Sequence, residues 1–207
     1  MSAARTDPLA DPSRVAVLTM ELQRGVCGDQ AALPQLADAV SAAGLPQQVN
    51  RLCVAARQHR ARVVHCTVEA RTDVAGRVNN NRLLAATADH ALSFVAGTPG
   101  AELLPTIGAV PADVTLSRLH GLTPFTGTSL DQVLRNMGIE TVVCTGVSIN
   151  VGILGMVLSA SDLGYQVIVP SDAVIGVPQS YADAVLHNTI SLLATITSVD
   201  EILARWS

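Results

Sequence analysis

Short apolar segments rich in β-branched residues alternate along this chain with segments of helical periodicity. VAVLTM (residues 15–20) and TVVCT (residues 141–145) are continuous apolar runs, the pattern of strands buried on both faces of a sheet. Residues 45–60 carry their apolar positions at helical spacing instead. This alternation favours an α/β fold, and we expect a three-layer α/β/α Rossmann-like sandwich with a mostly parallel sheet.

The same pattern predicts six strands, at residues 15–20, 62–66, 114–117, 141–145, 166–170 and 195–198. Helices are expected at residues 45–60, 129–137, 151–163, 181–193 and 200–206, with a short one near residues 83–90. Residues 67–112 have the least regular pattern, so we expect loops there that cover a site. No repeat or linker divides the chain, and residues 1–207 are expected to form a single domain.

Composition restricts the class of partner. A net charge of −4 and an aromatic content of 2% argue against nucleic acid, which requires a basic surface and stacking platforms. The apolar content of 49% exceeds what a monomer of this size needs to bury, so we expect a homo-oligomer, a dimer or a tetramer. Four cysteines without a CxxC pair and an N-terminus without an apolar signal segment predict a cytoplasmic protein.

The uncharged stretch at residues 141–161 is long enough to span a bilayer, but it is interrupted by Gly146, Ser148, Asn150, Gly152 and Gly155. A buried strand, a tight turn and a buried helix explain this stretch better, and no membrane partner is expected.

Candidate functional residues follow the ends of the predicted strands, because parallel sheets bind ligands beyond their carboxyl ends, where the strand order reverses. Glu21 follows the first strand and is suited to general acid or base chemistry; a structural carboxylate paired with Arg24 or another arginine is the alternative. Arg118 ends the third strand and could hold a substrate carboxylate or pair with Glu21. His120 lies in the next loop, where a histidine is more often solvated.

The segment GVSINVG (residues 146–152) joins a strand to a helix, and its backbone N–H groups could form an anion or oxyanion pocket. Neither GxGxxG nor GxxxxGK[ST] occurs in the chain, so no nucleotide cofactor is expected. Among the thiols, only Cys27 follows a strand end closely enough to be considered as a nucleophile, and it is a weak candidate.

Three segments together resemble the isochorismatase-like (cysteine hydrolase) superfamily. VAVLTMELQ (residues 15–23) is similar to the family's first strand, with Glu21 at the position of its catalytic Asp. SRLHGLTPFTGTSLDQVLRNMGIETVVCTGVSINVGI (residues 117–153) resembles the central signature that runs from the catalytic Lys to the nucleophile turn. SASDLGYQVIVPSDAV (residues 159–174) resembles the segment that follows.

The resemblance implies a divergent member without the nucleophilic cysteine. Covalent members use an Asp–Lys–Cys triad, whereas this chain has Glu21, Arg118 and Gly152. The family's Lys, counted back from Phe125, would fall on Leu119, so the match to Arg118 assumes a one-residue insertion. The resemblance implies a cis peptide at Val147–Ser148, and it implies substrate-binding positions at Gln23, His120, Phe125, Val147, Ser148, Asn150 and Val151.

Loss of the thiol leaves one family chemistry open. Isochorismatases proper also resemble this chain in having Gly at the nucleophile position, and they hydrolyse a vinyl ether without a covalent step. A carboxylic acid protonates the enol carbon, and water attacks the oxocarbenium that results. We therefore expect a hydrolase of a small, anionic or carbonyl-bearing molecule, cleaving a C–O or C–N bond without a cofactor.

A catalytically silent binding or assembly protein is the alternative, since all three triad positions differ. A closed pocket between Glu21 and Gly152 would favour that alternative. No metal is expected, because no Asp-x-His zinc motif follows the first strand.

Overall fold

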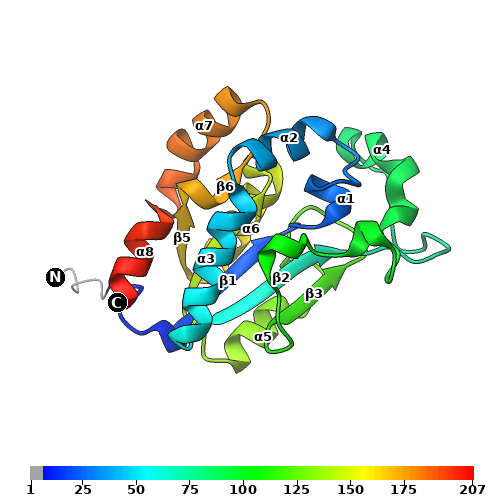
Figure 1. Ribbon diagram of the computed structural model, residues 1–207. Coiled ribbons are helices and arrows are strands. Elements are labelled where there is room, and N and C mark those ends of the chain that lie inside the picture. The colour runs from blue at the N-terminus through cyan, green and yellow to red at the C-terminus, as the bar shows by residue number, and fades with distance from the viewer. Residues whose placement is uncertain (1–6) are drawn as a thin grey trace.

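A parallel β-sheet runs through the middle of the molecule (Figure 1). In the computed structural model, which describes residues 7–207, the strands are ordered β3-β2-β1-β4-β5-β7, and each pair of neighbours is parallel. The strands are β1 (Val15–Met20), β2 (Arg62–Val68), β3 (Val114–Arg118), β4 (Thr141–Val147), β5 (Gln166–Pro170), β6 (Val174–Ile175) and β7 (Thr195–Thr197). The expected parallel α/β architecture is confirmed.

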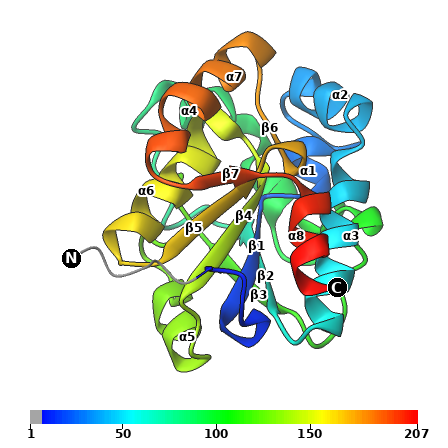
Figure 2. The same ribbon diagram turned by 90° about the vertical axis from the view of Figure 1, so that its left-hand side faces the viewer.

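Helices cover both faces of the sheet (Figures 1 and 2). The helices are α1 (Arg24–Cys27), α2 (Pro34–Ala42), α3 (Leu45–Gln58), α4 (Arg82–Ala86), α5 (Leu130–Asn136), α6 (Leu154–Asp162), α7 (Gln179–Asn188) and α8 (Val199–Trp206). Successive residues of β1 point to opposite faces: Val15 and Val17 pack with residues of α3 and α8, while Ala16 and Leu18 pack with residues of α5, α6 and α7. The sheet therefore separates two apolar cores.

The sheet has seven strands rather than the expected six. The additional strand, β6, is only two residues long and pairs with Gly146 and Val147 at the end of β4. Strand β5 covers only the first part of β4, which leaves room on the same edge for β6. A two-residue strand shows no periodicity, so the sequence pattern does not reveal it.

Helix boundaries differ from the prediction in three regions. Helices α1 and α2 lie between β1 and α3, where no helix was predicted. The helix expected from residue 151 is preceded by a π-helical turn, Ile149–Ile153, and α6 begins at Leu154. The helix expected over residues 181–193 ends earlier, with α7 followed by a 3₁₀ turn at Ile190–Leu192. The least regular region contains α4 and three 3₁₀ turns.

The uncharged stretch at residues 141–161 is a buried strand, a turn and a helix, as expected. Within residues 7–207, none of the helices combines the length and the apolar character that crossing a membrane requires.

The order of the strands places a switch point between β1 and β4. From β1 the chain builds β2 and β3 on one side, and it then returns to build β4, β5 and β7 on the other. Met20 and Gly146 are register partners at the ends of these two central strands. The residues that follow β1 and β4 therefore lie side by side, at the position where ligands bind in sheets of this kind.

Candidate active site

A cavity of about 140 Å³ lies beyond the carboxyl ends of β1 to β4. Most of its lining is apolar, and the charged residues in the lining are Glu21, Arg77 and Arg118. The other lining residues are Gly25, Val26, Ala32, Leu33, Leu36, Val68, Leu83, Leu84, Thr87, Phe94, Gly121, Leu122, Ser148, Val151 and Gly152. The cavity thus brings together five of the predicted site residues, namely Glu21, Arg118, Ser148, Val151 and Gly152.

Glu21 and Arg118 form an ion pair inside this cavity. The Arg118 side chain is only 4% exposed and donates from Nη2 to Glu21 Oε1. Its Nε donates to the carbonyl oxygen of Gly121 at 3.0 Å, and its Nη1 donates to that of Thr67 at 3.4 Å. All three guanidinium nitrogens therefore have a hydrogen-bond acceptor. Of the two roles predicted for Arg118, pairing with Glu21 is the one that the structure shows.

Glu21 itself occupies an unusual backbone conformation. Its φ angle is +51°, in the left-handed region that residues other than glycine seldom adopt. The Glu21 N–H donates to the Cys66 carbonyl at 2.9 Å, and the Glu21 carbonyl accepts from Gln23 N–H at 2.8 Å. This sharp turn directs the chain out of the sheet and leaves the Glu21 side chain 19% exposed beside the cavity. Backbone strain of this kind is concentrated at functional sites.

The turn after β4 forms the opposite wall of the cavity. The Val147–Ser148 peptide is cis, as the family resemblance implied. The amides of Val151 and Ile153 both donate to the Ser148 carbonyl, at 3.2 and 3.0 Å. The Val151 N–H, which belongs to the segment of the predicted anion pocket, is therefore already bonded within the turn, and so is the N–H of Ile153 next to that segment.

Gly152 lines the cavity, but the place of its missing side chain is not empty. A Cβ at this position would lie 2.9 Å from the Val147 carbonyl oxygen and 3.2 Å from Met20 Cε. The close contact with backbone cannot relax by a side-chain rotation. A side chain at position 152 would therefore force the backbone of the turn to shift.

None of the four cysteines, all within the described residues, lines the cavity. Cys27 is the thiol nearest in sequence to Glu21, and its Sγ donates to the Glu21 carbonyl at 3.6 Å. Burial, with a smaller contribution from the Glu21 charge, raises the pKa of the Cys27 thiol to about 12. Burial likewise raises the pKa of Cys66 to about 12. These thiols are structural and protonated at neutral pH.

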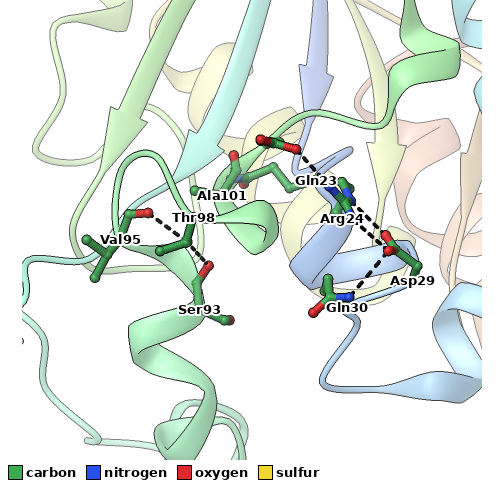
Figure 3. A network of polar contacts seen from close by, with 9 residues as sticks. Gln23, Arg24, Asp29, Gln30, Ser93, Val95, Thr98 and Ala101 are labelled. Carbon is green, nitrogen blue, oxygen red and sulfur yellow. Dashed lines mark hydrogen bonds and ion pairs between the residues drawn. The ribbon is translucent and has the colours of Figure 1, made fainter.

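Five predicted substrate-binding residues lie outside the cavity lining. Gln23 is fully buried, and its side-chain amide exchanges two hydrogen bonds with the Val68 backbone. Its Nε2 also donates to the Ala101 carbonyl (Figure 3), so Gln23 ties the end of β2 to a loop. Val147 is also fully buried, where it pairs with β6.

The other three residues are Phe125, Asn150 and His120, and each contacts other residues of the chain. Phe125 packs against Tyr165 in the core, with ring centroids 6.1 Å apart. Asn150 Oδ1 accepts from Ser148 Oγ at 2.9 Å, and its Nδ2 donates to the Val177 carbonyl. His120 Nδ1 accepts a hydrogen bond from the backbone N–H of Val78, with 3.4 Å between the two nitrogens. None of these three side chains lines the cavity.

The segment between β2 and β3 supplies lining residues that the sequence did not identify. Arg77, Leu83, Leu84, Thr87 and Phe94 come from this irregular region. The expectation that residues 67–112 hold loops covering a site is consistent with this placement, but no motif distinguishes the individual side chains. Among residues 7–207, no three His, Cys, Asp or Glu side chains are grouped so that they could hold a metal ion.

Comparison with known proteins gives consistent matches. A model of the isochorismatase domain matches residues 15–201. The isochorismatase family protein YwoC of Bacillus subtilis is 32% identical over 105 residues, which are 51% of this chain and 55% of that protein. The chain therefore matches only about half the length of this curated relative.

Solved structures match over nearly the whole chain. An isochorismatase family protein from Burkholderia thailandensis superimposes with a TM-score of 0.76 at 25% identity, covering 94% of this chain and 96% of that one. One from Desulfovibrio vulgaris superimposes with a TM-score of 0.77 at 25% identity, covering 92% and 98%.

Proposed function

Because this chain belongs to the isochorismatase family of hydrolases, we propose that it hydrolyses a small anionic substrate by acid–base catalysis without a covalent intermediate. The observation that carries this proposal is the cavity itself, which joins a carboxylate, Glu21, to a glycine, Gly152, at the turn where covalent members carry their thiol. No cysteine lines the cavity within the described residues. A vinyl ether is the substrate type that this set of groups suits best.

Glu21 supplies the proton. Its Oε1 accepts from Arg118, whereas Oε2 has no hydrogen-bond partner among residues 7–207. In a vinyl ether, the protonated carboxyl gives its proton to the terminal enol carbon and forms an oxocarbenium ion. The carboxylate then accepts a proton from the water that attacks this ion. The hemiketal collapses to an alcohol and a keto compound, and the acid is regenerated.

Arg118 acts through Glu21 in this scheme. Its guanidinium stabilises the carboxylate that forms when Glu21 gives up its proton, which favours the transfer step. It does so from a fixed position, since the carbonyl groups of Gly121 and Thr67 hold its other two nitrogens. Arginine remains charged at any working pH, so its role is electrostatic and it carries no proton in the cycle.

A catalytically silent binding protein is the alternative, and a closed site would have favoured it. Instead, Glu21 retains 19% of its side-chain exposure, and Glu21 and Gly152 line one shared cavity. Because Glu21 is accessible from the cavity, the geometry favours a hydrolase over a catalytically silent binding protein.

Direct turnover tests the proposal. Isochorismate serves as the vinyl-ether probe, and the released pyruvate is measured with a coupled reductase; nicotinamide serves as the amide probe. We expect pyruvate release, and in D₂O one deuterium in the methyl group of each pyruvate. Hydrolysis of nicotinamide alone would contradict the vinyl-ether chemistry, and turnover of neither probe would favour the silent protein.

We also propose that the protein is a homo-oligomer. Leu192, after α7, is 81% exposed, and Tyr181 and Leu158 are exposed on neighbouring helices. Large apolar side chains of this kind are commonly covered by a second subunit. Light scattering at micromolar concentration tests this, and a monomeric mass would contradict it.

A further inference from the structure

Gln23 is a fully buried polar side chain two residues after Glu21, and the proposed chemistry does not use it. Its side-chain amide makes three hydrogen bonds. Oε1 accepts from the Val68 N–H at 2.8 Å, and Nε2 donates to the carbonyl oxygens of Val68 and Ala101, each at 2.9 Å. A glutamine amide has two N–H groups, so both are occupied and neither is left for a ligand. Gln23 accordingly does not line the cavity.

The Gln23 amide continues the pairing of β1 with β2 beyond the end of their ladder. Within the ladder, Met20 is the register partner of Cys66, and the Glu21 N–H donates to the Cys66 carbonyl. The positive φ of Glu21 then turns the backbone out of the sheet. Two residues later, the Gln23 side chain bonds the N–H and the C=O of Val68, as the backbone of a neighbouring strand would. The side chain thus replaces backbone pairing that the turn removes.

The end of β2 that Gln23 bonds is also the segment that holds Arg118. Val68 and Arg118 are register partners in β2 and β3. The neighbours of Val68 bond Arg118 as well, since the Thr67 carbonyl accepts from its Nη1 at 3.4 Å and the Glu69 N–H donates to its carbonyl at 3.0 Å. Gln23 therefore fastens the turn after β1 to the same three residues of β2 that contact Arg118.

The third hydrogen bond of Gln23 holds the turn from another side. Ala101 begins a short segment that runs antiparallel to the turn, in which Gln23 and Leu103 form a backbone bridge (Figure 3). Next to this bridge, the Arg24 N–H donates to the Glu102 carbonyl at 2.9 Å, and the Arg24 Nη1 donates to the Glu102 carboxylate at 2.8 Å. The turn after β1 is thus fixed between the end of β2 and this segment.

The ion pair of Glu21 and Arg118 depends on such fixation. Glu21 follows β1 and Arg118 ends β3, and these strands are not neighbours, because β2 lies between them. The two side chains are therefore placed relative to each other through β2. Glu21 also has a φ of +51°, a conformation that a residue other than glycine keeps only where surrounding contacts hold it. Without those contacts, the Glu21 carboxylate would lose its set position beside Arg118.

We propose that Gln23 is a positioning residue, whose buried amide fastens the turn at Glu21 to the end of β2 and thereby sets the Glu21 carboxylate against Arg118. Gln23 acts through Glu21 and not on the substrate. The inference rests on the proposed function for its effect on turnover. Its effect on the ion pair is independent of that function, because the coupling between Glu21 and Arg118 can be measured without a substrate.

The first test measures the coupling between Glu21 and Arg118 with and without the Gln23 amide. Urea unfolding of the wild type, Glu21→Gln, Arg118→Met and the double variant gives the coupling energy, and the same four proteins are then compared in a Gln23→Met background. Methionine keeps the length of the side chain but makes none of the three hydrogen bonds. We expect the coupling energy to fall by at least about half in that background.

Leu134→Ala is the matched control background, because Leu134 is fully buried in α5 but does not line the cavity, and its truncation lowers stability in general. It should leave the coupling energy unchanged. An unchanged coupling energy in the Gln23→Met background would overturn the proposal, and so would an equal fall in the Leu134→Ala background. If Gln23→Met does not fold, Gln23→Asn, whose amide is one methylene short of Val68, carries the same expectation.

Turnover of isochorismate is the second test. Gln23→Met should lower kcat about 10- to 100-fold and change KM by less than about 2-fold, because Gln23 does not line the cavity. Added to Glu21→Gln, it should lower kcat no further, since it acts through Glu21. A further loss in that double variant, or a change in KM with kcat unchanged, would contradict the positioning role. If the coupling energy falls as expected and yet the wild type hydrolyses no probe, the proposed function fails while the positioning of Glu21 by Gln23 stands.

Discussion

A side-chain carbon at Gly152 would stand 2.9 Å from the carbonyl oxygen of Val147, closer than carbon and oxygen approach without a shift of one of them. The position that bears the nucleophile in covalent relatives is therefore packed against backbone in this chain. Gly152 also lines the cavity. The glycine therefore belongs both to the wall of the cavity and to a turn whose backbone a side chain would meet.

This packing predicts that Gly152→Ala destabilises the fold. Forcing a methyl group against the Val147 carbonyl should lower the free energy of unfolding by about 1–3 kcal/mol, measured by urea titration. Gly155→Ala is the control, because a Cβ at Gly155 would lie 3.5 Å from its nearest neighbour, Thr123 Cβ. It should be neutral or raise the free energy of unfolding by up to about 1 kcal/mol. Equal effects of the two substitutions would contradict the packing argument.

Thiol chemistry should play no part in activity. All four cysteines are buried, and burial raises the pKa of Cys53 to about 12, as it does for Cys27 and Cys66. Iodoacetamide should therefore leave the native protein unlabelled and its turnover unchanged at neutral pH, while labelling all four cysteines in urea. Rapid labelling of one native cysteine with loss of turnover would mean that a thiol participates.

A buried histidine makes the stability of the fold depend on pH. His65 accepts from the Thr19 hydroxyl at Nδ1, 2.8 Å away, and donates from Nε2 to Asp113 at 3.2 Å. Arg57 holds the same carboxylate. Burial lowers the pKa of His65 below its usual 6.5, despite the opposing effect of Asp113. The folded protein keeps this ring neutral where the unfolded chain takes up a proton.

The free energy of unfolding should therefore fall as the pH drops below about 6.5, by at most about 1.4 kcal/mol per pH unit from this group. Urea titrations at pH values from about 7.5 to about 5.5 measure the slope. His65→Gln should remove this part of the slope, whereas His187→Gln, at an exposed position, should keep it. An unchanged slope in His65→Gln would mean that the ring takes up a proton as readily in the folded protein as in the unfolded chain.

Glu21 and Arg118 should be energetically coupled. Arg118→Met leaves the partly buried Glu21 carboxylate without its cation, and we expect a loss of about 2–4 kcal/mol in the free energy of unfolding. Glu21→Gln combined with Arg118→Met should cost clearly less than the sum of the two single changes. Additive costs in a double-mutant cycle would mean that the ion pair contributes no mutual stabilisation.

Much of this arrangement is predictable from the sequence, because the strand-end rule uses only periodicity. It placed Glu21, Arg118 and the 146–152 turn at one edge of the sheet, and all three meet at the cavity. The rule cannot say which way a side chain turns. Gln23 and Asn150 sit at that edge too, but they bond backbone groups around the cavity.

Arg77, in contrast, lines the cavity although no sequence pattern pointed to it. It lies in an irregular segment whose path depends on tertiary contacts such as the one between Val78 and His120. No local pattern encodes such contacts, so the sequence offered no signal for it. Strand β6 was missed for a related reason, since its two residues pair with β4 only because β5 leaves that edge free.

The most direct test of the account is the effect of Glu21→Gln on kcat/KM for isochorismate. Glutamine keeps the size and polarity of the side chain but cannot give up a proton to the enol carbon. Glu69→Gln is the matched control, because Glu69 follows β2 as Glu21 follows β1 but does not line the cavity. The account predicts a loss of at least about 100-fold for Glu21→Gln and almost none for Glu69→Gln. Wild-type turnover in Glu21→Gln would contradict it.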